Sequence, residues 1–122
     1  MRFPTVILCD RECRVSAALR CAMPDAPWVL RHVQDFGDCR LLPASADPVV
    51  LFLRPAGEVV TALELLDWLQ ARGAATRTVL LLDAPDVESE ALAWNLGVAV
   101  VLQRPDWPCL PAILRALIAS RS

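Results

Sequence analysis

Acidic and basic side chains stand where several apolar runs of the chain end, in positions that one site could share. Asp10, Arg11, Asp83 and Arg104 each come at or just after the end of such a run. Carboxylates and guanidinium groups that meet neutralise one another in charge-assisted hydrogen bonds, which predicts a static ionic cluster. The alternative is an anion or nucleotide site built on Arg11 and Arg104. No Gly-rich loop follows Asp10 to bind a phosphate with backbone amides, so we expect no dinucleotide or flavin cofactor.

The other reactive side chains form no recognisable catalytic set. His32 is the single histidine, and we interpret it as a surface residue of an edge strand. The 5 cysteines contain no CxxC pair, which disfavours a zinc site, and Cys9 is expected to be a buried, neutral thiol. None of the 12 basic residues is Lys, so chemistry that needs an ammonium group is excluded. We expect neither catalytic residues nor a bound metal.

Composition limits the class of protein. The 122 residues suit one domain, residues 1–122, and the hydrophobic content of 56% favours a packed core. A net charge of −2 gives no basic surface for nucleic acid. No apolar run approaches the ~20 residues of a membrane span, and the first residues lack a signal-peptide pattern. We therefore expect a soluble, cytoplasmic protein.

Strands and helices are predicted to alternate along the chain. The run 49–53 is short, apolar and closed by Arg54–Pro55, which is typical of a strand buried on both faces of a parallel sheet. Further strands are expected at 5–8, 28–33, 78–82 and 98–102. Helical patterns cover 15–22, 57–73, 86–96 and 108–120, with Asp86 as N-cap and with Gly73 and Gly97 as helix stops. Residues 36–46 give the weakest signal.

This alternation predicts an α/β fold. Short connections and right-handed crossovers favour a flavodoxin-like, doubly wound sheet of five parallel strands with the order 2-1-3-4-5 and helices on both faces. In such a sheet the chemistry collects at the carboxyl ends of the strands, and the residues named above lie at that edge.

At this edge the chain resembles the receiver domains of two-component response regulators, which are CheY-like. Residues 6–12 resemble the first receiver strand with its acidic pair, and residues 47–55 resemble the phosphoacceptor strand. Residues 93–97 and Arg104–Pro105 resemble the end of the fourth receiver helix and the Lys-Pro pair after strand five. The resemblance covers nearly the whole chain and implies the same fold.

The resemblance also places substitutions in the receiver site. Of the two acids that hold Mg²⁺ in receivers, Asp10 is kept and Arg11 takes the second place. Phe52 falls at the phosphoacceptor Asp and offers no oxygen nucleophile. Phosphoryl transfer needs a nucleophile, a divalent metal and a cation, and only the cation remains. The resemblance therefore implies a pseudoreceiver without the aspartyl-phosphate switch.

Three further receiver positions also differ from the family pattern. The Thr or Ser position falls at Asp83, the Lys position at Arg104 and the aromatic switch position at Val101. The Arg104–Pro105 bond matches a bond that is cis in receivers, and the resemblance predicts cis here.

A protein partner is the remaining expectation. Receivers dimerise and dock effectors through the face of helix four, strand five and helix five, where Trp94, Val101 and Trp107 fall. The pattern places Trp94 on the side of its helix that is opposite to Val87, Ala91 and Leu96. Trp is enriched in binding hot spots, which favours an interface.

These observations predict a phosphorylation-independent interaction domain that binds a protein partner or forms a homodimer. We expect it to be the N-terminal regulatory domain of a bacterial signalling or transcriptional regulator. The alternative function is an anion or ligand sensor that uses Arg11 and Arg104.

Overall fold

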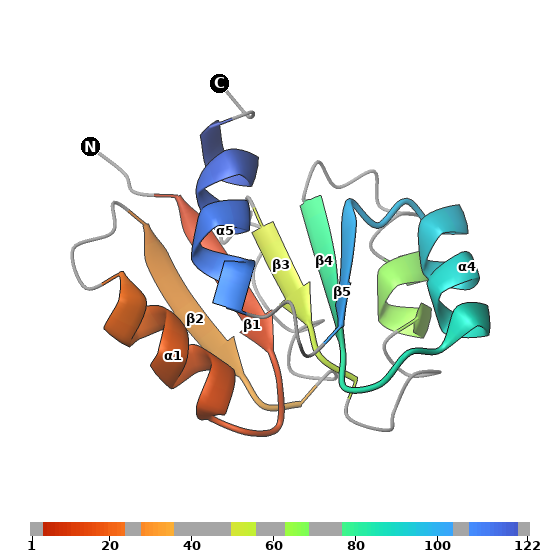
Figure 1. The fold of residues 1–122 in the computed structure, drawn as a ribbon, viewed down its shortest axis with the longest axis horizontal. Coiled ribbons are helices and arrows are strands. Elements are labelled where there is room, and N and C mark those ends of the chain that lie inside the picture. Colours follow the sequence, from red (N-terminus) through yellow and green to blue (C-terminus); the bar gives the residue numbers. More distant parts are fainter. Residues whose placement is uncertain are drawn as a thin grey trace.

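A computed structural model describes residues 4–23, 28–35, 50–55, 63–68, 77–103 and 108–119. It contains one parallel sheet with the strand order β2-β1-β3-β4-β5 (Figure 1). The strands are β1 (Thr5–Cys9), β2 (Val29–Val33), β3 (Val50–Leu53), β4 (Arg77–Leu82) and β5 (Val100–Gln103). The predicted sheet and its strand order are therefore confirmed. The strand ends differ from the predicted ones by one or two residues; for example, β5 begins at Val100 rather than at Val98.

Helices cover both faces of the sheet. They are α1 (Arg14–Ala22), α4 (Val87–Asn95) and α5 (Leu110–Ala119), and residues 63–68 are also helical. Helices α1 and α5 share one buried cluster with the sheet, while α4 and the helical residues 63–68 share the other. Among the described residues no helix is long and apolar enough to span a membrane.

The apolar strand runs reflect this double cover. Successive strand residues point to opposite faces, so Val6 and Leu8 of β1 enter the first cluster and Ile7 and Cys9 enter the second. Every residue of β3 is buried. At the sheet edge, β2 has mixed exposure and carries polar residues, as the sequence predicted for an edge strand.

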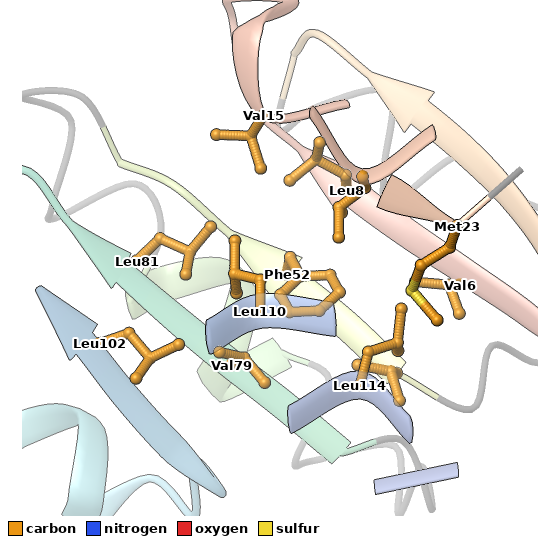
Figure 2. Close-up of a cluster of buried hydrophobic side chains, with 12 residues drawn as sticks. Val6, Leu8, Val15, Met23, Phe52, Val79, Leu81, Leu102, Leu110 and Leu114 are labelled. Atoms are coloured by element: carbon orange, nitrogen blue, oxygen red, sulfur yellow. The ribbon is translucent and has the colours of Figure 1, made fainter. Parts of the chain in front are cut away.

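Phe52 belongs to the core. It has no exposed surface and packs on the face covered by α1 and α5. Figure 2 shows its ring among side chains of β1, β4 and α5. The ring therefore lies between the sheet and these helices, on the residue before the last one of β3. Phe52 therefore contributes its ring to the apolar packing of this face.

The two ends of α4 are fixed as the sequence predicted. Asp86 is the N-cap, where its carboxylate accepts hydrogen bonds from the Ser89 amide at 3.2 Å and from the Ser89 hydroxyl at 2.7 Å. At the other end Gly97 adopts a φ of 86°, and the Val98 amide donates to the Ala93 carbonyl at 3.1 Å. This left-handed glycine closes the helix and turns the chain toward β5.

Several predictions fall outside the described residues. They concern residues 36–46, the stop at Gly73, the Arg104–Pro105 bond and Trp107. Of the helix predicted over 57–73, the structure describes the helical part 63–68.

Candidate functional site

The candidate site lies at the carboxyl end of the sheet, where β1, β3 and β4 finish. The register pairs Cys9 with Leu53, and the Arg54 amide donates to the Cys9 carbonyl at 3.0 Å. Arg54 therefore begins the loop after β3 at the same level as Asp10. Asp83 directly follows the last residue of β4. Because parallel neighbours finish side by side, three loops bring their first residues together here.

Arg54 binds three carboxylates at once. Its Nη1 atom lies 3.1 Å from Asp10 Oδ1 and 2.9 Å from Glu12 Oε2. Its Nε atom donates to Asp83 Oδ1 at 3.1 Å, and its Nη2 atom donates to Asp83 Oδ2 at 3.3 Å. The guanidinium thus makes a two-point contact with Asp83, a geometry that its planar fork favours. It links the loops after β1, β3 and β4.

Burial divides this cluster into an inner and an outer part. The side chains of Arg54 and Asp10 are 5% and 0% exposed, whereas those of Asp83 and Glu12 are 38% and 57% exposed. Burial alone lowers the pKa of Arg54, but the hydrogen bonds to Glu12 and Asp83 and the charge of Asp10 raise that pKa above its ordinary value. Arg54 is therefore a permanent cation at this place.

Asp10 is the most constrained acid of the cluster. Its Oδ1 atom accepts from Arg54 and also from the Glu12 amide at 3.0 Å. Its backbone carbonyl accepts from Nε2 of His32 at 2.7 Å, so that ring nitrogen carries the proton. Within the described part of the chain, Asp10 Oδ2 is buried without a hydrogen-bond partner. His32 thus supports the site from β2, a role that the sequence did not suggest.

The arrangement differs from the ionic cluster that the sequence suggested. Asp10 and Asp83 do meet, but the cation between them is Arg54. Sequence reasoning placed Arg54 at this edge as the residue that closes β3, but did not include it in the ionic cluster. Arg11 is exposed, and Arg104 lies outside the described residues. One signal pointed to Arg54: it is the first charged residue after the most apolar strand and stands at the same edge as the acids.

The residues present do not fit the divalent metal that receivers use. A guanidinium nitrogen already lies 3.1 Å from Asp10 Oδ1, where its positive charge repels a second cation. The described residues contain no group of three His, Cys, Asp or Glu side chains placed to hold a metal ion. In this cluster the guanidinium offsets part of the carboxylate charge from within the chain.

A second feature is the outer face of α4. Ser89 and Ala93 are its buried residues, and the large apolar residues Val87 and Trp94 are 80% and 52% exposed. Val87, Ala91 and Trp94 follow one another at four and three positions, so they share one face. The predicted placement of Trp94 opposite Val87 and Ala91 is therefore wrong, because all of them face away from the sheet. Val101 of β5 is half-buried against the core.

Comparison with solved structures identifies the fold of this chain. No family model and no curated protein matches the chain. Solved structures do match, among them a response regulator receiver protein from Pseudoalteromonas atlantica, with a TM-score of 0.85, 18% identity and coverage of 98% of this chain and 100% of that one. The signal receiver domain of an HD domain-containing protein from Pseudomonas fluorescens Pf-5 matches with a TM-score of 0.83 and 23% identity. That match covers 98% of this chain and 97% of the other.

A longer regulator also matches over part of its length. The RcsB response regulator of Salmonella typhimurium has a TM-score of 0.78 and 16% identity, with coverage of 98% of this chain and 62% of that one. The chain therefore has the CheY-like receiver fold over nearly its whole length, as the sequence resemblance implied. Many of its structural neighbours are receiver domains of response regulators.

Proposed function

We propose that this chain is a phosphorylation-independent signalling domain that acts by binding another protein. The observation that carries the proposal is the guanidinium of Arg54, bound to Asp10, Glu12 and Asp83 at the edge where receivers carry out their chemistry. A permanent internal cation would supply positive charge there in place of a metal ion. Phe52, which the sequence resemblance matches to the phosphoacceptor position, has no exposed surface. The likeness to receiver structures supports a role in signalling rather than an enzymatic one.

This domain would be the N-terminal regulatory part of a bacterial signalling or transcriptional regulator. The support is its coverage of 62% of the RcsB response regulator, which leaves the rest of that protein for other parts. Contact with a protein partner or a second copy would use the side of α4, β5 and α5, where Trp94 is exposed. A cytoplasmic location follows from this role.

The charge of the site weighs against the anion-sensing alternative. Among the described residues, three carboxylates contact the one buried guanidinium, so these four side chains together carry a net negative charge. An incoming phosphate would meet that charge before it reached Arg54. Arg11 and Arg104 would have to bind the anion without help from this cluster.

The test is a titration of the protein with Mg²⁺ alone, with Mg²⁺ plus beryllofluoride, and with inorganic phosphate. Amide NMR shifts of Asp10, Arg54 and Asp83 report each step, and a receiver that has the full acidic site serves as positive control. We expect no saturable shift in this chain. Saturation by Mg²⁺ and beryllofluoride would restore the phosphoryl switch, and saturation by phosphate alone would favour the anion sensor.

A further inference from the structure

The outer face of α4 presents an exposed apolar stripe. We define the α4 stripe as Val87, Ala91 and Trp94, all of which are exposed. Three of the exposed large apolar side chains of the described residues, Val87, Leu92 and Trp94, belong to this one helix of nine residues. The stripe is about 10 Å long at the usual rise of a helix. Large apolar side chains gathered in this way are typical of binding surfaces.

The charged residues of the described segment 78–103, which contains α4, all have one sign. From residue 78 to residue 103 the chain contains Asp83, Asp86, Glu88 and Glu90 and no basic residue. The helical period of about 3.6 residues places Glu88 on one side of the stripe and Glu90 on the other. The Glu90 carboxylate is oriented by Gln103 of β5, whose amide donates to it at 3.3 Å. The surface is therefore an apolar line between carboxylates.

This charge separates the classes of partner. A nucleic acid and an anionic membrane both carry phosphates, which the carboxylates repel. A second copy packed stripe against stripe brings Glu88 and Glu90 of both chains together, and α4 has no cation to offset them. A partner with positive charge on both sides of an apolar line gains attraction on both flanks.

We infer that the α4 stripe binds a basic amphipathic helix of another protein, one with large apolar residues every three or four positions and Arg or Lys on either side. A helix suits the site because a straight ridge on one helix packs along the groove of another. This inference rests on the proposed function, since it names the chemistry of the partner that the domain would bind. Trp94 would be the central anchor, and the two glutamates would set the preference for basic flanks.

The experiment uses three synthetic helical peptides with the same apolar residues and with Arg, Gln or Glu at the flanking positions. Each is titrated into the labelled chain at low and at high salt, and amide shifts map the contact. We expect the Arg peptide to bind best and to shift amides of α4. Trp94→Ala should weaken it about 30-fold or more, the range of a binding hot spot. Glu88→Gln with Glu90→Gln should weaken it about threefold to tenfold.

Val29→Ala is the matched control, because Val29 is an apolar side chain of similar exposure, 47%, on β2. This variant should bind the Arg peptide like the native chain. Equal binding of the Arg and Glu peptides, or shifts that map away from α4, would overturn the inference. So would a dimer, seen by sizing at several concentrations, that Trp94→Ala dissociates. Neither result depends on the titration with Mg²⁺ and beryllofluoride, so the two proposals fail separately.

Discussion

Replacement of Arg54 by leucine is the sharpest test of the buried charge cluster. Arg54→Leu keeps apolar bulk at the end of β3 but removes the cation that faces Asp10, whose side chain is 0% exposed. Breaking a buried ion pair on one side costs about 3–5 kcal/mol, because the remaining charge is buried without a partner. The bonds to Asp83 and Glu12 add little, since those carboxylates are 38% and 57% exposed and water replaces the lost contact. We therefore expect a loss of about 3–4 kcal/mol in the free energy of unfolding.

Urea denaturation followed by far-UV circular dichroism measures this loss. Arg54→Lys is the first control: it keeps the charge but cannot reach three carboxylates at once, so we expect an intermediate loss. The double variant Arg54→Leu with Asp10→Leu removes both buried charges, and it should regain much of the lost stability. If the free energy of unfolding of Arg54→Leu lies within about 1 kcal/mol of the native value, the guanidinium does not offset the burial of Asp10 and the reasoning is refuted.

Two further substitutions test other parts of the structure. Phe52→Asp should prevent stable folding instead of creating a phosphoacceptor, because it puts a carboxylate in a site without exposed surface. Phe52→Leu should lower the free energy of unfolding by only about 1–2 kcal/mol. Equal stability of the two variants by urea denaturation would contradict the core position of Phe52. Asp86→Ala should lower the melting temperature at pH 7 by removing the α4 N-cap, whose hydrogen bonds from Ser89 hold the pKa of Asp86 below its ordinary value. A lowered pKa stabilises the fold above the unfolded value of about 4, so the difference from the native chain should shrink as the pH falls below that value, and a difference that grows in acid would contradict the assignment.

The sheet could be predicted because each central strand is buried on both faces. That burial demands an unbroken apolar run, and runs such as 49–53 stand out between Pro and charged residues. The two ends of α4 could also be predicted. The carboxylate of Asp86 suits an N-cap, and the backbone freedom of Gly97 suits the left-handed residue that ends a helix.

The site was harder to predict because its partners come together only through the register of the strands. Sequence shows that Arg54 closes β3, but it does not show that the Cys9–Leu53 pairing sets Arg54 level with Asp10. The prediction for the outer face of α4 was wrong for a different reason. We expected Trp94 to lie opposite Val87 and Ala91, while all three are exposed and the helix buries Ser89 and Ala93. Small residues allow the helix to lie close to the sheet, and the larger ones remain outside.

The Arg54 cluster has a consequence for how its occupancy is controlled over time. A phosphoryl group or a metal ion arrives by diffusion and leaves again, so its occupancy depends on supply and lifetime. The guanidinium of Arg54 belongs to the chain and is held by Asp10, Glu12 and Asp83 in every folded molecule. It cannot be diluted, chelated or hydrolysed. Under the proposed function, the number of folded copies therefore sets how many occupied sites there are, and synthesis and degradation would replace chemical turnover as the means of changing it.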